Sequence, residues 1–148
     1  MRARSARKGW CVSEPFNIPI RVYIEDTDAG GIVYYVNYLK YMERARTELV
    51  RALGYDKPAM PQQGLLLVVH SAEIQYRRSA LLDDELRASA AVGKVGRAAV
   101  TFEQKIWRGN EIICEGVVKV ACVDDASRKP CALPENIHQA LKAASQNS

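Results

Sequence analysis

The order of the apolar patterns constrains the fold most, because one long helical pattern is followed by four strand patterns in a row. Residues 36–53 carry apolar side chains at helical spacing, in a stripe of Val36, Leu39, Met42, Ala45, Leu49 and Leu53. Tyr38 and Tyr41 widen this stripe, so we expect the helix to be buried on more than one side. At 1.5 Å per residue the helix would be about 27 Å long, and Gly54 is predicted to end it.

Strand patterns precede and follow this helix in the sequence. Residues 18–25 alternate between apolar and polar side chains, and residues 65–78, 85–92, 98–107 and 111–123 give four more strands. Gly93 with Gly96 marks one hairpin and Gly109 with Asn110 another, and a short helix is predicted at about 135–144. Among the side chains expected to face the core are Ile24, Ile112, Cys114 and Cys122.

Strands joined by tight turns pair antiparallel. The simplest arrangement is an α+β fold in which one curved antiparallel sheet of about five strands wraps around the single long helix. The edges and the outer face of such a sheet stay uncovered, which predicts pairing with a second subunit.

The excess of basic over acidic residues lies at the start of the chain. The net charge is +4, and Arg2, Arg4, Arg7 and Lys8 account for it. We therefore expect a basic tail over residues 1–16 and a single domain over residues 17–148. No aromatic residues interleave these charges, so nucleic-acid binding is not expected. No apolar run approaches the roughly 18 residues of a membrane span, so membrane insertion is not expected either.

The cysteines give no sign of a metal site. Cys11, Cys114, Cys122 and Cys131 form no C-x-x-C pair, so neither zinc nor a cofactor is predicted. We expect a reduced, cytoplasmic protein in which Cys114 and Cys122 act as small core residues.

The segment between the first strand and the helix concentrates the candidate chemistry. Glu25, Asp26 and Asp28 place three carboxylates within four positions, where they repel one another although a plain turn does not require them. Gly30 and Gly31 let the backbone approach a ligand closely, and the helix that follows offers free N–H groups for an oxyanion. A carboxylate with oriented donors suits acyl transfer, although Asp and Gly before a helix are also ordinary capping residues.

The run RVYIEDTDAGGIVYYVNYLKYMERARTELVRALG resembles the Tol-Pal-associated acyl-CoA thioesterases and the 4-hydroxybenzoyl-CoA thioesterases. The resemblance continues through VVHSAEIQYRRSALLDDEL, FEQKIWRGN and VKVACVDDASRKPCALP, and it covers roughly residues 18–142. Its most specific part is the D-x-D-x-x-G block that leads through I/V-V-Y/W into a helix. The resemblance implies the hotdog fold and a hydrolase acting on acyl-CoA, with acyl-carrier protein as an alternative carrier of the acyl group.

The resemblance also implies roles for particular residues. The family's catalytic Asp corresponds to Asp28, as nucleophile or as general base, and the backbone N–H at the Tyr35 position is implied to polarise the thioester carbonyl. Many Tol-Pal-type members carry His at that position and the hydroxybenzoyl-CoA type carries Tyr, so the acyl preference and a Tol-Pal connection stay open. The family's active sites form at a homodimer interface, and two dimers associate as a homotetramer.

Weaker candidates for substrate binding follow from the same resemblance. Gly30 lies beside the catalytic Asp, and Ser79 lies in a segment that lines the family's active site. Lys94 and Arg97 lie in the hairpin with which related enzymes hold the CoA nucleotide, and basic side chains suit its phosphates.

Two further titratable residues have alternative interpretations. Glu43 is a second catalytic candidate because another hotdog branch uses a helix Glu, but an ion pair with Arg44 or Arg46 is the simpler prediction. His70 is either a general base or an ordinary core or interface residue on a strand.

Other function classes compete with the thioesterase. A phosphatase of the haloacid dehalogenase type also has D-x-D after a strand, but it needs strands alternating with helices around a parallel sheet. Four consecutive strands argue against it. A non-catalytic acyl-CoA or acyl-carrier sensor on the same fold is the main alternative, although binding alone does not require Asp28. A scaffold that uses the basic tail at a membrane surface is a third.

Overall fold

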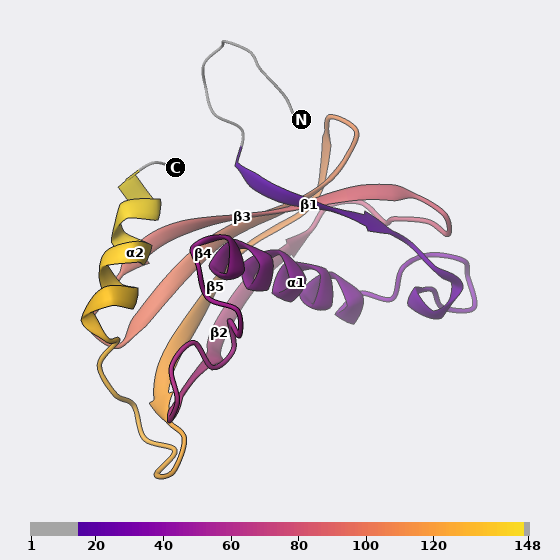
Figure 1. Cartoon of the computed structure of the whole chain (residues 1–148). Coiled ribbons are helices and arrows are strands. Elements are labelled where there is room, and N and C mark those ends of the chain that lie inside the picture. The colour runs from indigo at the N-terminus through magenta and orange to yellow at the C-terminus, as the bar shows by residue number, and fades with distance from the viewer. Residues whose placement is uncertain (1–14, 147–148) are drawn as a thin grey trace.

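Five strands form one sheet in the order β1-β3-β4-β5-β2, with the long helix α1 across one face (Figure 1). This computed structural model describes residues 15–146, so the predicted tail at residues 1–16 lies almost entirely outside the described residues. The strands are β1 Phe16–Arg21, β2 Leu65–Tyr76, β3 Glu85–Val95, β4 Ala99–Arg108 and β5 Glu111–Asp124, and the helices are α1 Val36–Ala52 and α2 Glu135–Gln146. All strand pairs are antiparallel, which confirms the predicted α+β class.

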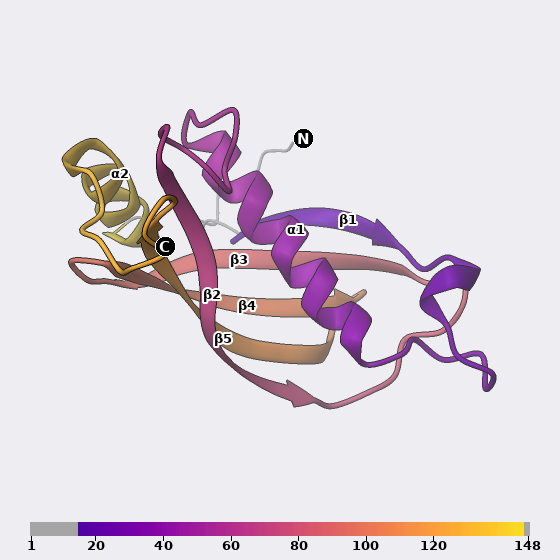
Figure 2. The ribbon, with the colours of Figure 1, turned by 90° about the horizontal axis from the view of Figure 1, so that it is seen from below.

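The core lies between α1 and the sheet. The helix packs on β1, β3 and β4 (Figure 2). Its Tyr41, Met42 and Ala45 side chains are fully buried. The predicted apolar stripe is wrong at Leu39, which is 38% exposed, whereas Tyr38 and Tyr41 are buried, as predicted. Two aromatic side chains remove more apolar area from water than one leucine, so they determine which face is buried.

A polar group is built into this core beneath α1. Gln104 of β4 is 1% exposed, and its amide nitrogen donates to the Met42 carbonyl at 2.8 Å and to the Ser89 carbonyl at 3.3 Å. Its amide oxygen accepts a hydrogen bond from Nη1 of the buried Arg46 at 3.0 Å. Burial lowers the pKa of Arg46. Gln104 therefore supplies the partner that a cation needs when it is removed from water.

The first strand is shorter than predicted. The strand pattern suggested that it runs to residue 25, but β1 ends at Arg21 and a 3-10 helix spans Ile24–Asp26. The Asp26 carboxylate accepts a hydrogen bond from the Tyr23 backbone N–H at 2.9 Å, and such local bonds compete with a sheet ladder. The prediction that Ile24 is buried is therefore wrong, since its side chain is 75% exposed.

A bulge changes which face β5 buries. Ile106 of β4 pairs with Cys114 and the next residue, Trp107, pairs with Ile112, so Ile113 is the extra residue. Ile113 is fully buried and Ile112 only half-buried, which corrects the prediction for Ile112. Cys114 and Cys122 are buried, as predicted.

Gly116 of β5 is a position where backbones approach too closely for a side chain. A Cβ atom there would lie 2.6 Å from the Glu73 carbonyl oxygen and 2.5 Å from the Ile74 Cδ1 atom. We expect Gly116→Ala to lower the free energy of unfolding by about 1–3 kcal/mol, because β2 must shift. Urea unfolding measures this loss. Gly96→Ala is the matched control, since a Cβ atom at Gly96 would meet its nearest atom at 3.4 Å. Equal stability of the two variants would contradict the prediction.

The C-terminal helix closes one end of the sheet. This helix, α2, packs on β3 (Figure 1). Its Ile137 and Leu141 side chains are buried. Within residues 15–146, no helix has the length and apolar character needed to cross a membrane.

Candidate active site

The loop that carries Asp28 is folded back on itself by its own backbone. The Asp28 N–H donates to the Ile32 carbonyl at 2.9 Å, and the Gly31 N–H donates to the Asp28 carbonyl at 3.0 Å. Gly31 has a φ of 80°, a conformation that glycine adopts at little cost. Thr27 and Val33 close the loop by an isolated antiparallel bridge.

A second segment, residues 77–84, holds this loop from the other side. Val33 N–H donates to the Ala80 carbonyl at 2.9 Å, and Ile32 forms a bridge with Leu81. Between the two segments lies a hollow of about 340 Å³, here called the Asp28 cavity. Its lining consists of Asp28, Ile32, Val33, Tyr34, Tyr35, Tyr38, Tyr76, Arg77, Arg78 and Ser79.

The structure separates the three neighbouring carboxylates. Glu25 is exposed, and Asp26 binds the Tyr23 N–H at the 3-10 helix. Asp28 alone of the three lines the cavity. Its Oδ1 atom accepts a hydrogen bond from the Gly30 N–H at 2.9 Å, which orients the carboxylate.

The start of α1 contributes to the lining of the Asp28 cavity a residue whose backbone donor is unpaired within residues 15–146. Tyr35 is the N-cap residue of α1 and lines the Asp28 cavity. The N–H groups of Tyr34 and Asn37 are taken by the carbonyls of Asp26 and Tyr34, both at 2.9 Å. The Tyr35 N–H has no acceptor among the described residues. The first N–H groups of a helix carry partial positive charge, so this one suits a developing oxyanion.

Aromatic rings form one wall of the cavity. Tyr76 of β2 packs edge-on against Tyr35 with ring centroids 5.8 Å apart, and it lies 5.7 Å from the ring of Tyr38. The Tyr38 hydroxyl accepts a hydrogen bond from the Ala80 N–H at 2.9 Å, and burial raises the pKa of Tyr38. Tyr38 therefore stays neutral and links α1 to the segment that faces Asp28.

Arg108 anchors the segment that carries Ser79. Its Nη1 atom donates to the Ser79 carbonyl at 3.1 Å and to the Asp84 carboxylate at 2.8 Å. Burial alone would raise the pKa of Asp84, but hydrogen bonds from the Leu81 N–H and from Arg108 lower it below its ordinary value.

The Arg108–Asp84 pair gives a pH-dependent prediction. A depressed pKa means that the stabilisation is present above the unfolded pKa of Asp, about 3.9, and is lost as pH falls through the folded value. We expect Arg108→Met to lower the free energy of unfolding by about 1–2 kcal/mol at pH 7. The difference in the free energy of unfolding between Arg108→Met and wild type should become smaller as the pH falls. Urea unfolding from pH 3 to 7 measures it, and a difference independent of pH would contradict the assignment.

The other candidates lie outside the Asp28 cavity of this chain. Lys94 and Arg97 flank the β3–β4 turn, whereas the opposite end of β3, at Glu85, adjoins the segment 77–84. A strand of this length spans about 35 Å, so a single chain does not bring these cations to Asp28. His70 and Glu43 are exposed and do not line the cavity.

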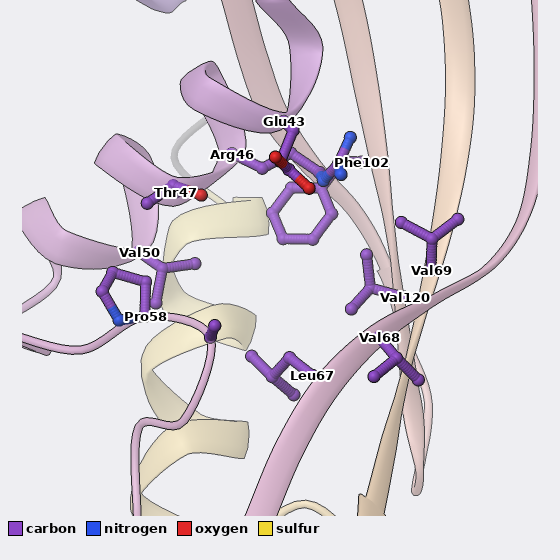
Figure 3. Close-up of a pocket in the computed structure, with 11 residues that line it drawn as sticks. Glu43, Arg46, Thr47, Val50, Pro58, Leu67, Val68, Val69, Phe102 and Val120 are labelled. Carbon is purple, nitrogen blue, oxygen red and sulfur yellow. The ribbon is translucent and has the colours of Figure 1, made fainter. Parts of the chain in front are cut away.

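A larger hollow of about 550 Å³ lies between α1 and β2 (Figure 3). Glu43, Arg46 and Thr47 line it from the helix, and apolar residues such as Leu67 and Val120 line it from the sheet. Among residues 15–146 Glu43 makes no direct ion pair with Arg44 or Arg46. Burial lowers the pKa of Arg46, but the Glu43 charge still acts on Arg46 and partly opposes that lowering. The sequence did not suggest this hollow, because it arises where β2 diverges from the helix.

Comparison with known proteins identifies the family. Residues 22–141 match the sequence family described as the thioesterase-like superfamily. The chain belongs to this superfamily. It is 43% identical over 127 residues to the acyl-CoA thioesterase YbgC of Haemophilus influenzae, covering 85% of this chain and 93% of that relative. The acyl-CoA thioester hydrolase YbgC of Escherichia coli is 38% identical over 123 residues, covering 82% and 92%.

Solved structures confirm the hotdog fold of this thioesterase-like protein. The DHNA-CoA thioesterase of Staphylococcus aureus superposes with a TM-score of 0.82 at 22% identity, covering 88% of this chain and 90% of that one. At this identity the likeness shows the fold alone. The family match and the YbgC relatives confirm the resemblance to acyl-CoA thioesterases that the D-x-D block suggested.

Proposed function

We propose that this thioesterase-like protein hydrolyses acyl-CoA thioesters at the Asp28 cavity. The observation that carries the proposal is that one hollow is lined both by Asp28, whose carboxylate the Gly30 N–H orients, and by Tyr35, the N-cap residue of α1. The names of the two YbgC relatives support the same reaction.

In the proposed reaction the thioester carbonyl accepts a hydrogen bond from the Tyr35 N–H. In one route the Asp28 carboxylate attacks the carbonyl carbon, the C–S bond breaks, CoA leaves as the thiolate, and water then hydrolyses the mixed anhydride. In the other route Asp28 takes a proton from a water molecule that attacks the carbonyl carbon, and the C–S bond breaks to release CoA and the free acid. Gly30 serves Asp28, because its N–H holds Oδ1 and leaves Oδ2 for the chemistry. The negative charge on the carbonyl oxygen grows in the transition state, where a preorganised donor stabilises it most.

The proposed substrate site needs a second subunit. Lys94 and Arg97 reach a CoA nucleotide only if they come from a neighbouring chain, with Ser79 lining the inner part of the cavity. The edge strand β2 supports a dimer, since within residues 15–146 it pairs with β5 alone and exposes Val68 and Val69. We further propose that dimers associate as tetramers in the cytoplasm, and that acyl-carrier protein competes with CoA as the carrier.

The proposed activity is tested with a panel of acetyl-CoA, palmitoyl-CoA and 4-hydroxybenzoyl-CoA. A colorimetric thiol reagent measures the free CoA that is released. We expect turnover of at least one of them by wild type, and the preferred acyl group identifies the substrate class. Tight binding of these compounds without turnover would support the non-catalytic sensor instead.

A further inference from the structure

Two thiols lie side by side where β5 meets the segment that follows it. Val123 and Pro130 form an antiparallel bridge, which sets Cys122 opposite Cys131. The Cys131 N–H donates to the Cys122 carbonyl at 3.0 Å, and the two Sγ atoms are 3.4 Å apart. Neither cysteine lines the Asp28 cavity, so the proposed hydrolysis does not use them. The sequence does not reveal this pair, because the two residues are nine positions apart and form no C-x-x-C motif.

We propose that Cys122 and Cys131 form a reversible disulfide when a hydroperoxide oxidises the protein. The backbone geometry already suits the bond. Directly opposed residues of an antiparallel pair have Cα atoms about 4.5–5.5 Å apart, which lies within the range that disulfides bridge. The turn between them is closed in the reduced protein by bonds from the Asp124 N–H to the Lys129 carbonyl and from the Ser127 N–H to the Asp124 carboxylate, both 2.8 Å.

The two thiols differ in how they meet the oxidant. Cys131 is partly exposed and Cys122 is buried. Burial and the contact with Cys131 raise the pKa of Cys122 to about 12. Cys131 therefore reacts first, since the thiolate form and access to solvent control the attack. Cys122 reacts second, and its fixed position beside Cys131 offsets its weak acidity.

The chemistry proceeds in two balanced steps. The Cys131 thiolate attacks one peroxide oxygen, the O–O bond breaks, and a sulfenic acid and hydroxide form. Cys122 sulfur then attacks the Cys131 sulfur, the S–S bond forms, and the hydroxyl leaves as water. Overall two thiols lose two protons and two electrons, and hydrogen peroxide is reduced to two water molecules.

The disulfide would fasten the C-terminal segment to the sheet. The same segment contacts the β3–β4 turn, where the Leu133 N–H donates to the Arg97 carbonyl at 2.8 Å. Closing the turn covalently restricts the unfolded chain, so we expect the midpoint of thermal unfolding to rise by roughly 5 °C on oxidation.

The test uses the full-length chain, reduced with dithiothreitol, freed of it and treated with hydrogen peroxide. Remaining thiols are alkylated under denaturing conditions, and peptide mass spectrometry locates any disulfide. We expect a Cys122–Cys131 bond that dithiothreitol reverses, in wild type and equally in Cys11→Ser and Cys114→Ala. Cys122→Ser should stop at a sulfenic acid on Cys131 that dimedone captures, and Cys131→Ser should leave Cys122 reduced.

Three results would overturn the proposal. The first is wild type in which both thiols are still fully alkylated after peroxide treatment. The second is a disulfide that joins Cys131 or Cys122 to Cys11 or Cys114. The third is over-oxidation of Cys131 at the same rate in wild type and in Cys122→Ser, because Cys122 then does not react with the sulfenic acid on Cys131.

Discussion

Replacing Asp28 with Asn is expected to lower kcat/KM for the best acyl-CoA substrate by about 10³-fold, or about 4 kcal/mol of transition-state stabilisation. Asn keeps the size of the side chain and an oxygen that the Gly30 N–H can bind, so the loop should stay folded. It removes the negative charge that attacks the carbonyl or accepts the proton from water. Steady-state release of CoA, with circular dichroism to establish the fold, measures the effect.

Asp56→Asn is the matched control for this loss. Asp56 is also exposed, but it follows α1 at the end away from the Asp28 cavity. We expect its kcat/KM to equal that of wild type. A folded Asp28→Asn variant with wild-type turnover would remove Asp28 from the mechanism while leaving the thioesterase activity itself established.

The role of Asp28 as nucleophile or general base is distinguished by a single turnover in isotope-labelled water. If Asp28 attacks the carbonyl, water resolves the mixed anhydride and the label can enter the Asp28 carboxylate. If Asp28 activates water, the label enters only the released acid. Mass spectrometry of the peptide that contains Asp28 separates the two routes.

The second large effect is expected at Gln104. Gln104→Leu should lower the free energy of unfolding by about 3 kcal/mol, because it leaves the buried Arg46 guanidinium without its partner. The Ser89 carbonyl also loses a donor. Urea unfolding followed by tryptophan fluorescence measures the loss.

A double variant separates this explanation from simple loss of packing. Arg46→Met removes the cation, so Arg46→Met with Gln104→Leu should recover most of the stability that Gln104→Leu loses. If the two losses add instead, Gln104 is not the partner that offsets the buried charge.

The parts of the fold that depend on local spacing were predictable. The bounds of α1 followed from helical periodicity and from Gly54, and the structure ends the helix at Ala52. The errors occurred where tertiary packing or side-chain bonds prevailed. Leu39 is exposed because the buried face of α1 is the one that carries Tyr38 and Tyr41, and Ile24 leaves the strand because Asp26 caps a 3-10 turn. The bulge at Ile113 could not be predicted, because the alternation of apolar and polar residues along a strand does not reveal an inserted residue.

The candidate site divides in the same way. Asp28, Gly30 and Tyr35 are close in sequence, so one motif suggested them together. Tyr76 and Arg108 lie on β2 and β4, and only the folded chain brings them to the segment beside Asp28. Lys94 and Arg97 are the opposite case. The resemblance implies that they bind the CoA nucleotide, but a single chain does not bring them to Asp28.

The most direct measurement of the central claim is a crystal structure of Asp28→Asn with an intact acyl-CoA bound. We predict that the thioester carbonyl oxygen lies within about 2.7–3.1 Å of the Tyr35 backbone nitrogen, with its carbon beside residue 28. We also predict that the nucleotide lies against Lys94 and Arg97 of a neighbouring subunit. A thioester held in the hollow between α1 and β2, near Glu43 and Arg46, would contradict the account and would move the active site along the helix.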